Sequence, residues 1–149
     1  MYSVWLSDEQ QDLWRSYLAM TTRLQAAMNR QLQDDCGISL SDYDVLVALS
    51  EAGPLRPYEL GDKLAWEQSR LSHQLRRMHD RGLVARHASA DDRRGALVEL
   101  TEDGMTALRA AAPGHAKLVR TVVFDGMTPA QRHALQKWTR AVTSRLRST

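Results

Sequence analysis

The spacing of apolar residues predicts a long amphipathic helix over residues 8–36. Ser7 and Gln10 form a capping-box pattern, in which the two side chains accept hydrogen bonds from backbone N–H groups of the first turn, and Gly37 marks the end. Between them, apolar side chains recur at spacings of three and four: Leu13, Tyr17, Met20, Leu24, Met28 and Leu32. The helix is roughly 40 Å long at 1.5 Å per residue, which exceeds one small core. The stripe is therefore expected to pack against a partner chain or, alternatively, along its own domain.

Two shorter helices follow. The first covers residues 41–51, opens at Ser41 and ends at Gly53 and Pro54, because this pair cannot continue a helix. The second opens at Pro57, since proline lacks only a donor that would be unsatisfied at a first helical position anyway.

The next segment predicts a third short helix and a hairpin. After a turn at residues 65–67, the helix covers residues 68–81 and ends at Gly82. Its buried stripe consists of Leu71, Leu75 and Met78. Residues 83–87 and 96–100 predict two strands around a polar loop with a basic tip. Two short helices, a tight turn and a hairpin are typical of a winged helix-turn-helix, whose second helix can enter a major groove.

The last third predicts two more helices. Thr101 can cap one that ends near Asp125, and Pro113 with Gly114 is expected to kink or split it. The final helix starts at residues 128–131, which combine a cap, a first-turn proline and a capping-box glutamine. Its apolar face consists of Leu135, Trp138, Val142 and Leu146.

These elements predict a mostly α-helical fold with a small β-hairpin wing, in a single domain of residues 1–149. Residues 37–101 are expected to form the winged helix-turn-helix lobe. Residues 1–36 and 102–149 are expected to form a dimerisation layer of N- and C-terminal helices.

Composition narrows the class of protein. The chain has 43% hydrophobic and 26% charged residues, as in an ordinary globular domain. No segment approaches the roughly 20 apolar residues that span a bilayer, and Asp8, Glu9 and Asp12 stand where a signal peptide would be basic. We therefore expect a cytoplasmic protein with no membrane partner. The single cysteine, Cys36, excludes an internal disulfide and a cysteine-rich zinc site, and we expect no metal and no cofactor.

Charge is unevenly distributed along the chain. Residues 1–53 carry three basic and eight acidic side chains, residues 54–96 nine and six, and residues 97–149 eight and four. Seven arginines and three carboxylates fall within residues 68–94. That stretch is a candidate for phosphate contact, although on charge alone a solvated face explains it equally well.

The face of the helix at residues 68–81 opposite its apolar stripe is more specific. Its outward residues are Gln68, Ser69, Arg70, Ser72, His73, Arg76 and Arg77. A solvated helix would carry more Glu and Lys, but residues 68–79 contain no carboxylate. Arginine can bind guanine with two hydrogen bonds and glutamine can bind adenine in the same way, so the face favours contact with DNA.

The order of these motifs resembles the MarR (multiple antibiotic resistance regulator) family of bacterial repressors over nearly the whole chain. The motifs are residues 37–46, residues 59–64, Ser69-Arg70-Leu71-Ser72, residues 81–84, Asp92-Arg93-Arg94-Gly95 and Leu100-Thr101-Glu102-Asp103-Gly104. The resemblance implies a homodimer with interlocked terminal helices that binds a palindromic operator in double-stranded DNA. It also implies a small-molecule or redox signal that releases the DNA.

The resemblance also assigns roles to residues. Gln68, Ser69, Arg70, Ser72 and His73 would contact bases and phosphates, and Arg94, with Arg93 beside it, would form the basic wing tip. Asp92 would pin that loop by pairing with a nearby arginine and so direct Arg94 toward a narrow minor groove. One departure is Glu67, which stands where the family usually has a Ser or Thr helix cap.

Other functions are less well supported. The sequence lacks the Gly-x-Ser-x-Gly, phosphate-binding glycine loop and His-Glu-x-x-His motifs, so we expect no enzyme. A dimeric adaptor that binds protein instead of DNA would not need the basic face. A redox role for Cys36 is disfavoured, because Asp34 and Asp35 beside it would raise rather than lower a thiol pKa. Trp14, Tyr17 and Met20 either line a ligand cleft or belong to the core.

Overall fold

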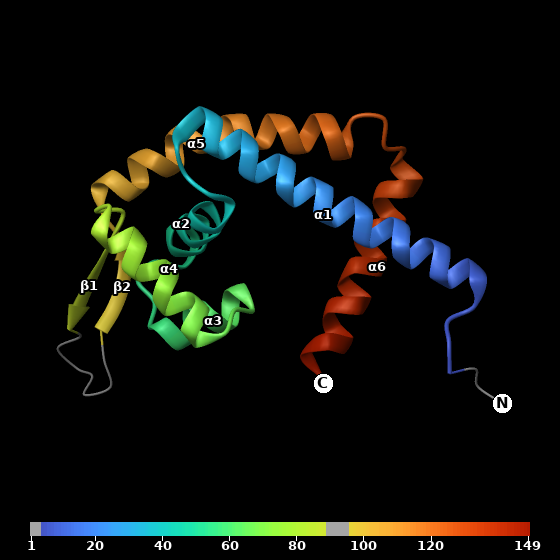
Figure 1. Cartoon of the computed structure of the whole chain (residues 1–149), viewed down its shortest axis with the longest axis horizontal. Helices are drawn as coiled ribbons and strands as arrows, with labels where there is room; N and C mark the ends of the chain where they lie inside the picture. Colours follow the sequence, from blue (N-terminus) through green and yellow to red (C-terminus); the bar gives the residue numbers. More distant parts are fainter. Residues whose placement is uncertain (1–3, 89–95) are drawn as a thin grey trace. The chain divides into compact units, whose positions relative to one another are not determined.

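A computed structural model describes residues 4–88 and 96–149. The chain divides into two compact units, residues 1–115 and residues 116–149 (Figure 1). Asp92, Arg93 and Arg94, the residues predicted for the wing tip, lie outside the described residues.

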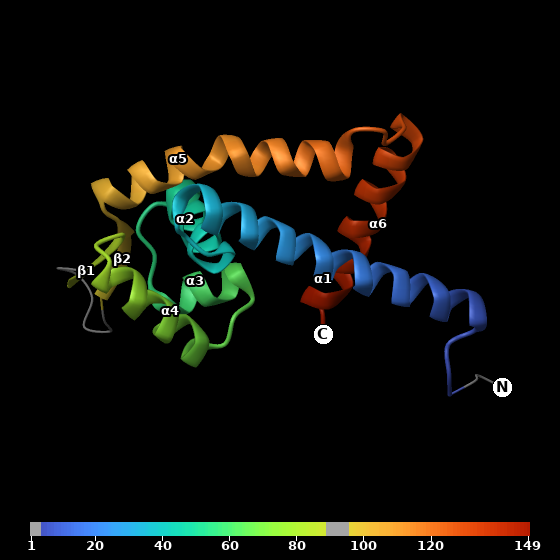
Figure 2. The same cartoon turned by 45° about the horizontal axis from the view of Figure 1, so that its top comes forward.

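The first unit begins with α1 (Asp8–Cys36), a single uninterrupted helix (Figure 2). Ser7 and Gln10 form the predicted capping box, and Gly37 ends the helix in the left-handed conformation at φ 66°. Leu32, near the end of α1, is fully buried, whereas Leu13 is 71% exposed. Leu13 and Met20, in the first half of the apolar stripe, are therefore not covered within the first unit.

Helix α2 (Leu40–Ala52) begins earlier than the sequence predicted, because its cap is Ser39 and not Ser41. The Ser39 hydroxyl accepts from the Asp42 N–H at 3.0 Å, and the Asp42 carboxylate accepts from the Ser39 N–H at 2.9 Å. Ser41 and Asp44 have the same spacing, but the tertiary contacts of Asp42 decide in favour of Ser39. Helices α3 (Pro57–Leu64) and α4 (Gln68–Asp80) then follow as predicted, and Ala65 makes the turn with φ 56°.

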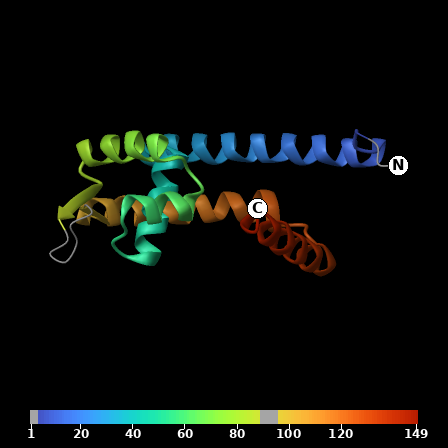
Figure 3. The same ribbon diagram turned by 90° about the horizontal axis from the view of Figure 1, so that it is seen from below.

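The hairpin leads directly out of α4 (Figure 3). Strands β1 (Val84–Ala88) and β2 (Ala96–Leu100) are antiparallel, with Val84 opposite Leu100 and Arg86 opposite Val98. Leu55, between α2 and α3, pairs with Val98 and joins the hairpin to the helices. The predicted winged helix-turn-helix is therefore present.

One hydrophobic core holds α2, α3, α4 and the hairpin together. It includes all three residues of the predicted α4 stripe. Its largest fully buried side chains are Leu32, Leu46, Leu60, Leu71, Leu75, Met78, Val45 and Val98. Each such side chain contributes roughly 1.5–3 kcal/mol by leaving water, so this core fixes which face of α4 points outward.

A buried carboxylate supplements the core. Asp42 is 5% exposed, and besides Ser39 it accepts hydrogen bonds from the Gln74 amide at 2.5 Å and the Arg81 guanidinium at 2.9 Å. Arg81 also donates to the Gly37 carbonyl at 3.0 Å. The contacts tie both ends of the α1–α2 junction to α4.

Helix α5 (Glu102–Val119) starts at Thr101, whose hydroxyl accepts from the Gly104 N–H at 3.0 Å. Gly104 is required there, because an added Cβ would lie 2.1 Å from the Leu83 carbonyl oxygen. The helix continues through Pro113, so of the two predicted outcomes, a kink or a split, the split does not occur. A proline removes one backbone hydrogen bond, which a long helix can tolerate by bending.

The chain then forms a π-helical turn, η1 (Arg120–Phe124), and ends with α6 (Pro129–Arg147). Thr128 and Gln131 form the predicted capping box. In the second unit, Leu146 is 71% exposed, as expected if the apolar face of α6 is covered only when the chain assembles with another copy.

The contacts of Asp42 predict a stability effect. Replacing Asp42 by Ala is expected to lower the free energy of unfolding by about 1–3 kcal/mol, because the Gln74 amide and the Ser39 N–H lose their acceptor. The control, Asp34→Ala, removes an exposed carboxylate near the end of α1 and should change stability by less than about 0.5 kcal/mol. Urea denaturation at one fixed protein concentration measures both. Equal effects of the two changes would show that the buried carboxylate does not hold α4.

Candidate nucleic-acid interface

The outward side of α4 carries every helix residue predicted to face DNA. Gln68, Ser69, Arg70, Ser72, His73, Arg76 and Arg77 are all exposed. At 3.6 residues per turn, Ser69, His73 and Arg76 lie opposite the buried stripe, and the other four lie on the flanks of the helix. The centre of the exposed face therefore consists of a hydroxyl, an imidazole and, on its side toward β1, a guanidinium, and the Asp80 carboxylate follows in the last turn.

Gln68 lies on the flank that faces α3. Its amide is 3.4 Å from the Pro57 carbonyl oxygen, to which it donates. A Cβ at Gly61 would lie 2.3 Å from that amide nitrogen, so glycine makes room for it. Glu67 precedes α4 and makes no side-chain capping hydrogen bond, which agrees with the departure noted in the sequence.

Two of the arginines are held by neighbours on the opposite flank. The Arg70 guanidinium lies over the Trp66 ring, 4.1 Å from its centroid. The Arg77 guanidinium donates to the Gln74 amide oxygen at 2.8 Å. In the free chain neither side chain extends freely from the centre of the face.

A groove of about 300 Å³ lies between α4 and β1. It is lined by Ser72, Arg76, His79 and Arg86. Neither His79 nor Arg86 belongs to the DNA-contacting residues predicted from the sequence. Alternation along the strand could have identified Arg86, because it shares a face of β1 with buried Val84, the face that looks toward α4.

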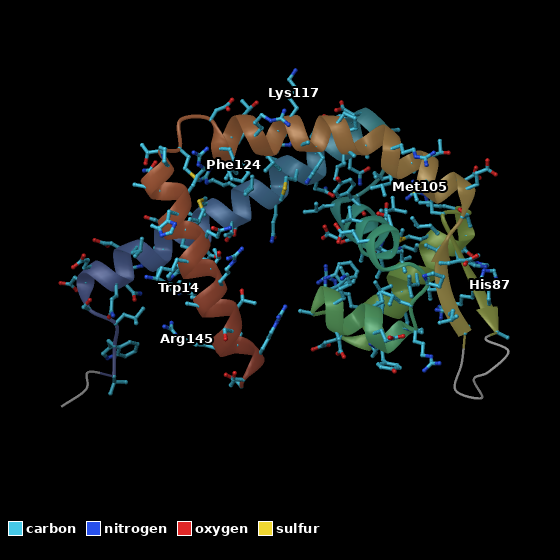
Figure 4. All side chains as sticks on the ribbon, turned by 180° about the vertical axis from the view of Figure 1, so that it is seen from behind. Trp14, His87, Met105, Lys117, Phe124 and Arg145 are labelled. Atoms are coloured by element: carbon cyan, nitrogen blue, oxygen red, sulfur yellow. The ribbon has the colours of Figure 1, made fainter. Side chains whose placement is uncertain are left out.

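His87 lies on the other face of the same strand. Its imidazole pairs with the Glu99 carboxylate of β2. Figure 4 shows the His87 side chain at the outer side of the hairpin, pointing away from the helices. The two faces of β1 therefore differ, with an arginine toward α4 and a histidine–glutamate pair away from it.

A second cleft, of about 490 Å³, lies on the flank of α4 that carries Arg70. Its lining residues come from α1, α2, the turn before α4 and α4 itself: Thr22, Gln25, Ala26, Asn29, Leu40, Ser41, Asp44, Trp66 and Arg70. Trp14, Tyr17 and Met20, considered as cleft residues from the sequence, do not line it. Trp14 and Tyr17 instead stack on each other, with ring centroids 5.7 Å apart.

Three titratable groups lie together where α2 meets α5. The His115 ring is 4.4 Å from the Tyr43 ring, and its Nδ1 atom is buried without a hydrogen-bond partner among the described residues. Burial lowers the pKa of His115, although the nearby Asp44 carboxylate opposes this. Burial raises the pKa of Asp44, against the attraction of His115 and Arg70. The pKa of Tyr43 is raised by burial and by Asp44.

Within residues 4–88 and 96–149, no group of three or more His, Cys, Asp or Glu side chains is placed to hold a metal ion. Among those same residues, no helix has the length and apolar character needed to cross a bilayer. Cys36 is partly buried and packs against the core.

Comparisons with known proteins agree on one family. Residues 37–95 match the family model described as MarR family. The organic hydroperoxide resistance transcriptional regulator of Bacillus subtilis is 32% identical over 87 residues, which are 58% of this chain and 59% of that protein.

Two solved structures match almost the whole chain. Sco3205 of Streptomyces coelicolor, a MarR family transcriptional regulator in complex with DNA, is 40% identical, with a TM-score of 0.90 over 95% of this chain and 94% of that one. AbsC of Streptomyces coelicolor, another MarR family transcriptional regulator, is 34% identical, with a TM-score of 0.92 over 99% of this chain and 100% of that one.

The burial of His115 predicts how stability depends on pH. Because its pKa in the folded chain is below the ordinary 6.5, the unfolded chain binds more protons as the pH falls below that value, and stability should decrease. The raised pKa of Asp44 acts in the opposite direction, closer to its ordinary 3.8. In His115→Phe the new side chain cannot titrate and keeps a ring beside Tyr43. The denaturation midpoint of this variant should therefore fall less than that of the wild type between about pH 7 and about pH 5, the range in which histidine changes its charge. The control His133→Phe changes an exposed histidine of α6, and it should keep the wild-type pH dependence. An unchanged profile in His115→Phe would contradict this assignment.

Proposed function

This chain belongs to the MarR family of transcriptional regulators and binds DNA, and we propose that it is a cytoplasmic repressor that binds a palindromic operator as a homodimer. Its relatives are transcriptional regulators rather than enzymes, and the chain is not an enzyme. The observation that carries the proposal is the exposed face of α4. That face has hydrogen-bond donors and cations over residues 68–79 without a carboxylate.

Ser69 and His73, at the centre of this face, are the residues that we assign to reading bases. Ser69 and His73 lie near the N-terminal half of α4, the half of a recognition helix that contacts base edges. A serine hydroxyl can donate or accept in the major groove, and an imidazole N–H can donate to guanine or adenine N7. Gln68 and Arg70 remain proposed contacts. To reach a base, Gln68 must leave the Pro57 carbonyl, and Arg70 must leave the Trp66 ring.

A homodimer is supported by uncovered apolar side chains in both units. In α1, Leu13 is 71% and Met20 54% exposed, and in α6 Leu135 and Leu146 are exposed. Apolar stripes that a chain leaves in water are typical of an interface with another copy. Two copies related by a two-fold axis present two α4 helices, which is why we propose an operator with two inverted half-sites.

We also propose that a small molecule in the cleft on the Arg70 flank releases the DNA. The support is the lining: Trp66 offers an aromatic ring, and Arg70 offers a cation that forms no ion pair with a described carboxylate, although the Asp44 carboxylate of the same cleft attracts it. An aromatic anion fits this combination. Because Arg70 belongs to α4, a ligand bound there would act on the DNA-reading helix itself.

The first experiment tests sequence reading. DNA fragments are selected with the purified protein, and the affinities for the selected operator and for scrambled DNA are compared at one stated salt concentration. We expect His73→Ala to weaken operator binding by about 1–3 kcal/mol and scrambled DNA much less. The control Arg109→Ala removes an exposed arginine from α5 and should preserve the ratio of the two affinities. If the wild type prefers no fragment, the chain is an adaptor rather than an operator-binding repressor.

The second experiment tests the dimer. Sedimentation equilibrium is expected to show that the wild-type chain is a dimer at micromolar concentration. The variant Met20→Asp is expected to be a monomer, because the new charge lies on the exposed apolar stripe of α1. The control Ala19→Asp adds the same charge at the neighbouring, exposed position outside the stripe, and it should remain a dimer. A folded wild-type monomer at this concentration would exclude the proposed assembly.

A further inference from the structure

The groove between α4 and β1 has walls from two different elements. Ser72, Arg76 and His79 line the α4 side, and Arg86 lines the β1 side. All four side chains can donate hydrogen bonds, and no carboxylate is among the lining residues. Within the described residues, neither Arg76 nor Arg86 forms an ion pair with a carboxylate. The groove is therefore a positively charged concave surface.

The shape of the groove follows from how the hairpin packs. Gly82, with φ 74°, turns the chain from α4 into β1, so the two elements start together and diverge (Figure 1). Near the junction, Val84 is buried under α4, and Val98, which lies opposite Arg86 on β2, is also buried. Arg86 is two residues further along the same face of β1, where it is exposed. It is the first side chain on that face beyond the core.

On α4, the helical period separates this flank from the reading face. Ser72 and His79 are seven residues apart in the sequence and therefore lie on the same flank of α4, about two turns apart. Arg76 lies between this flank and the centre of the exposed face. His79 is 3.9 Å from Asp80, its neighbour in sequence, whose carboxylate does not line the groove. When the centre of the exposed face of α4 lies against the bases, this flank faces one edge of the major groove.

What borders a major groove is a sugar-phosphate backbone on each side. We propose that the groove between α4 and β1 holds one of these two backbones, with Arg76 and Arg86 binding its phosphates from opposite walls and Ser72 and His79 donating to the same oxygens. This inference rests on the proposed function, because it requires α4 to lie in the major groove. It adds Arg86 and His79 to the DNA-contacting residues and gives them a different task from Ser69 and His73.

That task is positioning. Phosphate contacts carry no base information, but they fix the depth and register of a recognition helix, and they supply the salt-dependent part of the affinity. A backbone held from two walls cannot slide toward either one, so α4 is placed relative to the base edges. Arg86 is accordingly a positioning residue and not a reader.

The test compares variants on operator and scrambled DNA over a range of salt concentrations. Arg86→Ala is expected to weaken both DNAs by a similar factor, roughly tenfold, and to lower the slope of log affinity against log salt by about one unit per protomer. Arg86→Lys keeps the charge and should restore most of the slope. Arg109→Ala removes one exposed arginine from α5 without touching the groove, and it should leave the slope close to that of the wild type.

A second measurement locates the contact. Each phosphate of a half-site is replaced in turn by an uncharged methylphosphonate. For the wild type, neutralising a phosphate at the edge of the major groove should weaken binding, whereas for Arg86→Ala the same replacement should have little further effect. His73→Ala, which alters the reading face, should keep the full sensitivity to that phosphate.

The outcomes separate the inference from the function on which it rests. If the wild type binds its operator selectively but Arg86→Ala has the wild-type affinity, salt slope and methylphosphonate pattern, the groove does not hold a backbone. If Arg86→Ala weakens the operator alone and scrambled DNA not at all, Arg86 reads bases and the positioning role is wrong. If the wild type shows no selective binding to any DNA, the proposed function fails before the groove is tested.

Discussion

The carboxylate of Asp42 joins two segments that are far apart in the sequence, residues 37–42 and residues 74–81. It accepts from the Ser39 N–H at the start of α2, from the Gln74 amide in α4 and from Arg81 just after α4. Arg81 in turn reaches the Gly37 carbonyl at the end of α1. A buried carboxylate is costly unless all its hydrogen bonds are made, so α4 has one favourable position relative to the α1–α2 junction. A displacement of that junction must move α4 or break these bonds, and this gives the proposed regulator a direct connection between α1 and the DNA-reading helix.

The same network helps to decide which arginines of α4 are available to contact DNA. Gln74 uses its amide N–H on Asp42 and its oxygen on Arg77, so Arg77 is held by the structure that orients the helix. Arg70 is held by the Trp66 ring on the wall of a cleft. Arg76, by contrast, has no such partner among the described residues and lies on the side that faces β1. Counting cations along α4 therefore overstates how many are ready to contact DNA, and the direction in which each is held decides its role.

Local signals in the sequence predicted most of the fold, because the caps at Ser7 and Thr128 and the stops at Gly37 and Gly82 act through nearby backbone atoms. The errors arose where distant contacts decide. Ser39 caps α2 instead of Ser41 because Asp42 also binds α4, and these partners are 32 and 39 residues away. The exposed face of α4 was predicted from its period, but period alone does not show that Trp66 holds Arg70. Alternation along β1 indicates that Arg86 shares a face with Val84, but only the packing of β1 against α4 places it in the groove with Arg76 and His79.

Electrostatics over the first unit also favours one orientation of bound DNA. The whole chain has a net charge of only +2, yet residues 1–53 carry three cations against eight carboxylates, and residues 54–96 carry nine against six. A polyanion approaching such a chain is repelled by the segment that contains α1 and α2 and attracted by the segment that contains α4 and β1. Over distances longer than about 10 Å salt screens this difference, so it steers the encounter and does not hold the complex. Holding requires short contacts from side chains with no competing partner, and on the described part of the first unit the groove of Arg76 and Arg86 supplies two such guanidinium groups beside the reading face. Affinity and sequence discrimination are thereby assigned to different surfaces of the same lobe.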